Sequence, residues 1–120
     1  MSGAAAEKSI IPEDPEDRKI ITLARSAAAR TGAPQGACVR DADGRTYAGT
    51  SVLIPHLELS AVTVTVAMAA SSGAGGLEAA AVAGAAPNQA DLDVLRDLAQ
   101  PTAAVWHVDL QGEVISVTEL

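Results

Sequence analysis

Residues 77–98 read LEAAAVAGAAPNQADLDVLRDL, and this stretch decides the fold class. It begins with a continuous apolar run, Leu77 to Gly84, which has the length and character of a strand buried on both faces of a sheet. Pro87 and Asn88 then open a segment with Leu92, Leu95 and Leu98 on one helical side. A buried strand followed at once by an amphipathic helix is typical of an α/β protein.

A first helix is predicted to begin after Asp14, upstream of this unit. Asp14 supplies an N-cap, Pro15 occupies the first helical position and two acids follow in the first turn. Apolar residues recur at helical spacing until Gly32, a C-cap. We expect residues 1–13 to be a flexible tail and residues 14–120 to form a single domain.

The remaining segments alternate in a way that predicts one mixed sheet. Residues 35–40 and 45–49 form a predicted hairpin, and residues 103–108 and 113–117 form two further strands. Residues 57–72 fit two interpretations, since Val and Thr alternate as in a strand while the length and the Gly73 stop favour a buried helix. With a helix there, we expect a three-layer α/β/α fold, a mixed five-stranded sheet with helices on both faces.

Composition limits the classes of partner. The net charge is −7 and the eight Lys and Arg residues are scattered, so nucleic acid is not an expected partner. No apolar run reaches the roughly 20 residues of a membrane span. The N-terminus lacks the pattern of a signal peptide and the chain has a single cysteine, Cys38, so we expect a cytoplasmic location. Phe is absent, and small side chains bury little area, so we expect a homo-oligomer.

Four segments at matching spacing resemble the cytidine deaminase family. Gln35-Gly-Ala-Cys38 corresponds to the family's Val-Gly-Ala-Ala, and Gly49-Thr-Ser-Val-Leu53 to its Gly-x-Asn-Val-Glu. Ser60-Ala-Val62, with Gly73 beyond, reproduces the spacing of its Cys-Ala-Glu helix. Pro87 to Leu98 aligns without a gap to its Pro-Cys-Gly-x-Cys-Arg-Gln-Val-Leu-Arg-Glu-Phe. The resemblance covers roughly residues 17–120 and implies the three-layer fold.

The resemblance also implies a zinc site, and this sequence departs from it at every position. The ligand positions hold Ser60, Asn88 and Asp91, and the position of the proton-shuttling glutamate holds Val62. Zinc in proteins is held by thiolate, imidazole or carboxylate, and valine accepts no proton. We therefore expect no zinc and no catalytic residue. The family's sugar-binding Asn and Glu become Ser51 and Leu53, and its pyrimidine-stacking aromatic aligns with Ala33.

Other chemistry-bearing residues favour structural roles. The spacing of Asn88 and Asp91 is that of an N-cap and an acid in the first turn. Cys38 is predicted to be buried in a strand, and a zinc site from Cys38, His56 and His107 would need a coincidence of folding.

Four aspartates are further candidate metal ligands. These residues, Asp41, Asp43, Asp91 and Asp93, suggest a hard-cation site, but they are more typical of a solvated surface.

Three functions remain open from the sequence. The first is an inactive deaminase-like protein with a structural or interaction role as a homo-oligomer. The second is a module that binds a nucleoside or other small polar ligand through Ser51, Ser60, Asn88, Gln89 and free N–H groups at the helix starts. The third is a divergent deaminase, a hydrolase with a different metal or none.

Overall fold

The computed structural model describes residues 11–120, so most of the tail expected over residues 1–13 lies outside the described residues. From residue 11 onward, the described chain forms α2 (Pro15–Thr31), β1 (Gln35–Asp41), β2 (Thr46–Thr50), β3 (Val52–Ile54), β4 (Leu57–Leu59), α3 (Ala61–Ser71) and β5 (Leu77–Gly84). The chain continues through α4 (Gln89–Leu98), β6 (Ala99–Val108) and β7 (Val114–Glu119).

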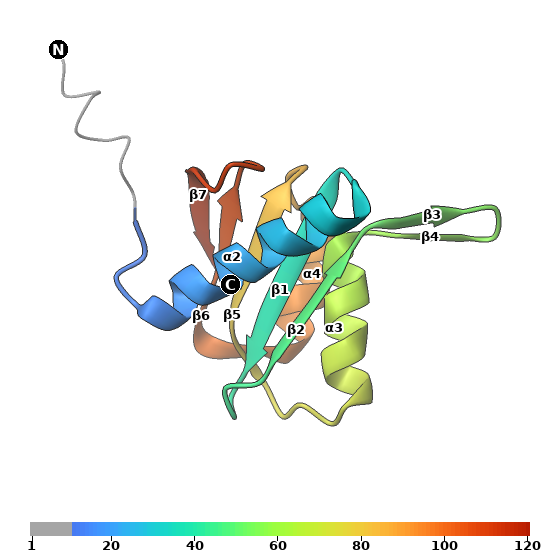
Figure 1. Cartoon of the computed structure of the whole chain (residues 1–120). Helices are drawn as coiled ribbons and strands as arrows, with labels where there is room; N and C mark the ends of the chain where they lie inside the picture. The colour runs from blue at the N-terminus through green and yellow to red at the C-terminus, as the bar shows by residue number, and fades with distance from the viewer. Residues whose placement is uncertain (1–10) are drawn as a thin grey trace, which may run out of the picture.

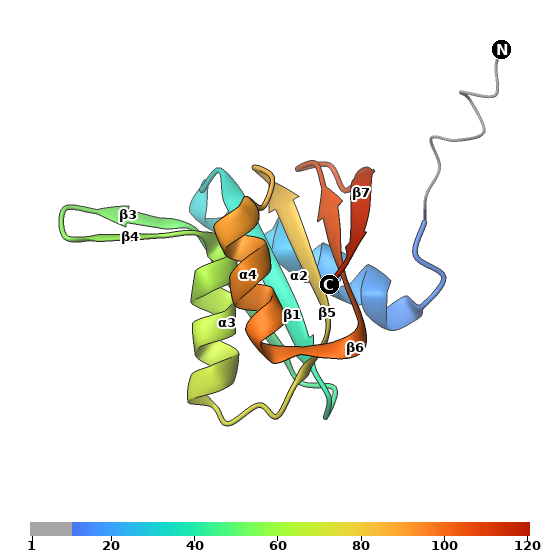
Figure 2. The same cartoon turned by 180° about the vertical axis from the view of Figure 1, so that it is seen from behind.

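The predicted three-layer α/β/α architecture is confirmed. Five strands form one sheet in the order β2-β1-β5-β6-β7. Only β5 and β6 pair in parallel, so the sheet is mixed. Helix α2 crosses one face of the sheet, and α3 and α4 cover the other, as Figures 1 and 2 show from opposite sides.

Helix α2 begins and ends where its capping residues predict. The Asp14 carboxylate accepts from the backbone N–H of Glu16, and Gly32 closes the helix at φ 71°, in the left-handed region that glycine tolerates. The helix packs closely on β1 at Gly36, because a Cβ at that position would collide with the Ala24 carbonyl oxygen. Gly36 therefore sets the distance between this helix and the sheet.

The segment that fitted both a strand and a helix contains one of each. Residues Leu57–Leu59 form β4, and the rest is helix α3, capped by the Ser60 hydroxyl on Thr63 N–H. Its buried residues are Ala61, Val62, Thr65, Val66 and Ala69. This spacing of three and four residues places them on one side of a helix, whereas the Val-Thr alternation alone suggested a strand.

The sequence analysis missed a second hairpin, made by β3 and β4. The two strands pair antiparallel around a turn at Pro55 and His56 and form a sheet of their own. The hairpin projects away from the body of the molecule (Figures 1 and 2). Each strand has only three residues, too few to show an alternating pattern in the sequence.

Two apolar clusters hold the layers together. On the α3 and α4 face, Val39, Val62, Val82, Leu95 and Val105 belong to one buried cluster. On the α2 face, the second cluster includes Ile20, Ala24, Cys38, Ala81 and Val108. Among the described residues, none of the helices has the length and apolar character that a membrane crossing requires.

Candidate functional site

A cleft of about 730 Å³ opens where α3 and α4 begin. Figure 2 shows the starts of both helices at the same end of the sheet, near the base of the projecting hairpin. The residues lining it come from the α2–β1 turn, the hairpin and the two helix starts: Ala33, Pro34, Ser51, Val52, Leu53, Glu58, Leu59, Ser60, Thr63, Asn88 and Asp91. Six positions singled out from the sequence therefore meet in one place.

Ser60 and Asp91 contact each other directly at the floor of this cleft. The Ser60 hydroxyl donates a hydrogen bond of 2.6 Å to Asp91 Oδ1. Asp91 is 3% exposed, and its other carboxylate oxygen accepts from Asn88 N–H at 3.1 Å. Both carboxylate oxygens are thus engaged, which satisfies a buried charge that would otherwise be costly.

Asn88 and Asp91 form the reciprocal cap that their spacing predicts. The Asn88 side-chain oxygen accepts from Asp91 N–H at 2.8 Å, and the Asp91 carboxylate accepts from Asn88 N–H in return. This is the arrangement of a capping box, in which the side chain of each residue accepts a hydrogen bond from the backbone N–H of the other. The first turn of α4 is therefore fixed by its own side chains.

Several N–H groups expected to be free for a ligand are already bonded. Ala61 N–H donates to the buried side chain of Gln35 at 2.9 Å, and Thr63 N–H donates to Ser60. Asn88 N–H and Asp91 N–H are taken by the capping box. The expectation that these helix starts offer N–H groups to a ligand is therefore wrong at these four positions, because side chains from the same region reach them first.

Two predicted residues lie away from the cleft. Val62 is 1% exposed and packs in the apolar cluster beneath α3 rather than lining the cleft. Gln89 lies on the exposed surface of α4, where its side-chain amide donates to Asp93 at 2.9 Å. The position matched to a catalytic glutamate thus belongs to the core.

Three polar residues that the sequence analysis did not select belong to this region. Glu58 and Thr63 line the cleft, the first from β4 and the second from the first turn of α3. Gln35 lies beneath it and donates from its amide to the Ala85 carbonyl while it accepts from Ala61 N–H. Gln35 opens the segment Gln35-Gly-Ala-Cys38, and its place at the start of a predicted core strand was a signal for a buried polar role.

The lining of the cleft is acidic and partly apolar. Glu58 and Asp91 are its charged members, and the lining residues, all within the described part of the chain, include no Lys, Arg or His. A phosphate group would have no cation to contact there. The cleft therefore suits an uncharged or positively charged molecule with hydroxyl or amide groups.

The cytidine deaminase-like sequence family matches residues 13–112. The chain belongs to this family. No curated protein is similar enough to count as a match.

Solved structures of cytidine deaminases share the fold of this cytidine deaminase-like protein. The enzyme from Burkholderia pseudomallei is 26% identical, with a TM-score of 0.73 over 84% of this chain and 90% of that one. The enzyme from Mycobacterium leprae is 20% identical, with a TM-score of 0.67 over 78% of this chain and 89% of that one. The enzyme from Mycobacterium tuberculosis is 24% identical, with a TM-score of 0.63 over 77% and 85%. The last two similarities concern the fold alone.

The residues at the positions that the resemblance matches to zinc ligands are not suited to hold zinc. A serine hydroxyl and an asparagine side chain are not among the ligands that hold Zn²⁺ in proteins. The oxygens of Ser60, Asn88 and Asp91 are also engaged with one another and with backbone N–H groups. No catalytic step through a metal is therefore derived for this cytidine deaminase-like chain.

Cys38, His56 and His107 do not come together. Cys38 lies at 0% exposure under α2, and burial raises the pKa of its thiol to about 11, so the thiolate that binds metals is disfavoured. His107 contacts the Gly84 carbonyl at 2.8 Å, and His56 lies in the turn of the projecting hairpin. Within residues 11–120, no group of three His, Cys, Asp or Glu residues is placed to hold a metal ion.

The aspartates expected on a solvated surface divide into two classes. Asp43 and Asp93 are exposed, but Asp41 is 1% exposed and Asp91 is buried, so the surface interpretation is wrong for these two. The reason is local hydrogen bonding, because Asp41 accepts from the N–H groups of Asp43 and Arg45 and from the Tyr47 hydroxyl. Burial alone would raise the pKa of Asp41, but these donors outweigh it and lower the pKa below its ordinary value.

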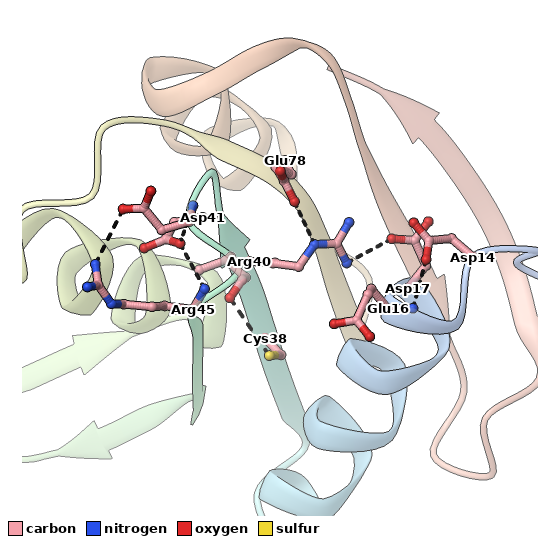
Figure 3. A network of polar contacts seen from close by, with 10 residues as sticks. Asp14, Glu16, Asp17, Cys38, Arg40, Asp41, Arg45 and Glu78 are labelled. Atoms are coloured by element: carbon pink, nitrogen blue, oxygen red, sulfur yellow. Dashed lines mark hydrogen bonds and ion pairs between the residues drawn. The ribbon is translucent and has the colours of Figure 1, made fainter.

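A second polar cluster ties α2 to the sheet at the end opposite Gly32. Figure 3 shows the Arg40 guanidinium between Glu78 of β5 and Asp17 of α2. Arg40 Nε donates to Glu78 at 2.8 Å, and Nη1 lies 3.0 Å from Asp17 Oδ1 in an ion pair without good hydrogen-bond alignment. The Arg40 side chain is 8% exposed, so this cluster contributes to the packing of α2 rather than to the cleft.

Proposed function

We propose that this protein is a catalytically inactive member of the cytidine deaminase-like family that binds a small polar molecule in the cleft. The observation that carries the proposal is the cleft itself, because Ser60, Asn88 and Asp91 line an open space. Side chains that merely filled a vacated site would leave no such volume. Pockets of this size suit a ligand of nucleoside or similar dimensions.

The inactivity rests on the chemistry at the same positions. A deaminase needs an activated water and a group that carries protons to the leaving ammonia. Val62 is apolar and buried, and Ser60 and Asp91 are bonded to each other. The cleft thus offers positioning groups and no residue set for proton transfer beside a metal.

Ligand binding is tested by thermal shift with uncharged nucleosides and their 5′-monophosphates. We expect at least one nucleoside to raise the Tm. Its monophosphate is expected to leave the Tm unchanged, because the acidic cleft repels the phosphate group. Ser51→Trp fills the cleft and abolishes the shift, whereas Ser71→Trp, at an exposed position on the far end of α3, preserves it. A flat response of the wild-type protein to the whole panel contradicts the binding proposal.

Inactivity is tested separately from binding. Purified protein is incubated with cytidine and deoxycytidine, ammonia release is measured, and bound metal is determined by elemental analysis. We expect neither ammonia nor stoichiometric zinc. Ammonia release with zinc present supports the remaining alternative, a divergent deaminase.

A homo-oligomer with a structural or interaction role is the second candidate function. The projecting hairpin exposes Leu53 at 78%, Ile54 at 56% and Leu57 at 45%. An apolar projection of this kind is typical of a surface that is covered in an assembly. Light scattering at micromolar concentration tests it, and a monomer mass contradicts it.

A further inference from the structure

Strand β7 is an edge strand with unpaired backbone groups. Within residues 11–120 its only neighbour in the sheet is β6, and Figure 1 shows it at the outer side of the molecule. Leu120 N–H donates to the Ala103 carbonyl, and Val117 lies opposite Trp106. Because antiparallel partners bond at alternate residues, Ser116 and Thr118 bond to β6, and Val117 and Glu119 direct their N–H and C=O groups outward.

Lys and Pro, which commonly protect such an edge, are missing from the middle of β7, and its one irregularity is a register shift that leaves Ile115 without a partner on β6. Proteins commonly place Lys, Pro or a covering segment at exposed edges. Residues Val114 to Thr118 contain neither Lys nor Pro, four of the five are β-branched, and Ile115 and Val117 are 56% and 39% exposed. Helix α2 packs on β1, β2 and β5, and Val114, the first residue of β7, packs against the same apolar cluster.

We propose that β7 pairs antiparallel with β7 of a second copy across a two-fold axis, so that two five-stranded sheets become continuous. Val117 lies opposite its own counterpart, and its outward N–H and C=O groups exchange hydrogen bonds with the same groups of the copy. In this register, Ser116 faces Thr118 of the copy, a favourable pair of hydroxyl side chains. The two Val117 side chains also extend the apolar row that begins at Trp106.

Charge selects this register over its neighbours. A shift that centres the axis on Ser116 places Glu119 opposite Glu113 of the copy, and like charges directly opposite each other are destabilising. A shift that centres it on Thr118 pairs only Val117, Thr118 and Glu119 of a strand that spans Val114–Glu119. With the axis at Val117, Glu119 faces Ile115 and five residues of the strand, Ile115 to Glu119, are paired.

The occupant is a second copy rather than an unrelated strand because the segment is complementary to itself. In this register the apolar Val117 faces Val117 of the copy, and the hydroxyl side chain of Ser116 faces that of Thr118. No acidic side chain faces another, so no cation is needed between the strands. The inference rests on the homo-oligomer proposed above and adds to the projecting hairpin a second surface through which copies join.

Cross-linking tests the register directly. Under mild oxidation, Val117→Cys is expected to give a disulfide-linked dimer on a non-reducing gel, because opposed residues in paired strands have Cα atoms about 5.5 Å apart. Ser116→Cys is the matched control at an equally exposed neighbour. Its distance to its own counterpart is about 8 Å in this register, beyond the reach of a disulfide. The native Cys38 does not interfere, since it is fully buried.

A second variant asks whether the edge is needed for assembly. Val117→Lys is expected to halve the mass measured by light scattering while circular dichroism stays unchanged, and Ser26→Lys on exposed α2 is expected to leave the mass unchanged. If the wild-type protein is an oligomer but Val117→Cys forms no disulfide, the β7 pairing is overturned and the oligomer stands. If the wild-type protein is a monomer, both are overturned.

Discussion

Ser60 and Asp91 join the first turns of two helices through one hydrogen bond of 2.6 Å between a hydroxyl and a carboxylate. Ser60 is the N-cap of α3, and Asp91 is the third residue of α4 and part of its capping box. The same two side chains therefore cap their own helices and connect them to each other. The resemblance matches both positions to metal ligands, and here a hydrogen bond connects them.

The first prediction concerns Asp91. Asp91→Ala removes the bond to Ser60 and half of the capping box, and we expect it to lower the free energy of unfolding by about 2–3 kcal/mol. Asp93→Ala, two residues along at an exposed position, is expected to change it by less than about 0.5 kcal/mol. Urea unfolding of the two variants measures the difference, and equal effects would contradict the assigned role.

The second prediction concerns the close packing of α2 on β1. Gly36→Ala places a Cβ against the Ala24 carbonyl and the Ala28 backbone, so we expect a loss of about 2–3 kcal/mol in unfolding free energy. Gly75→Ala is the control, since no atom lies within 4 Å of a Cβ there. Thermal and urea unfolding compare them. A Gly36→Ala protein as stable as the wild type would mean that the helix can move away from the strand at no cost.

The third prediction compares two arginines with acidic partners. Arg40→Ala leaves Asp17 and Glu78 without their shared cation in a largely buried place, and we expect a loss of at least about 2 kcal/mol. Arg45→Ala breaks an ion pair with Asp43 in which both side chains are at least 70% exposed, and we expect a change under about 0.5 kcal/mol. Urea unfolding at low and high salt tests this ranking, and a reversed order would refute it.

The fourth prediction concerns alkaline pH. Burial raises the pKa of the Cys38 thiol from 9.0 to about 11, so the folded protein favours the protonated form. The resulting stability is present in full below pH 9 and is lost as pH rises through about 11, an effect on the order of 2 kcal/mol. Between pH 8 and 11, Cys38→Ala should therefore lose less stability than the wild type. Urea unfolding measures the unfolding free energy of both proteins at each pH. If it falls equally with pH in the wild type and in Cys38→Ala, the prediction is contradicted.

Much of the fold follows from local patterns in the sequence. Asp14 and Gly32 bound α2 because a cap and a left-handed glycine act over a few residues, and Asn88 and Asp91 mark the start of α4 for the same reason. The apolar run from Leu77 predicts the buried central strand β5. These elements depend on neighbours in the chain, which is why they can be predicted.

The features that the sequence did not predict depend on contacts between distant residues. The β3–β4 hairpin has no long alternating pattern, and the helix over Ala61–Ser71 is decided by which side chains the sheet buries. Gln35 and Ala61 meet across 26 residues, and Ser60 and Asp91 across 31. The resemblance to the cytidine deaminase family identifies the cleft residues Ser60, Asn88 and Asp91, but the bond that connects two of them appears only in three dimensions.

The bond between Ser60 and Asp91 also restricts how this sequence can change by single steps. A cysteine at position 60 alone would remove the hydroxyl donor and leave the buried Asp91 carboxylate with one partner fewer. A cysteine at position 91 alone would remove half of the cap of α4. Each of these two single substitutions toward a metal-binding set thus gives a less stable protein, so neither ligand can be introduced alone without a loss of stability.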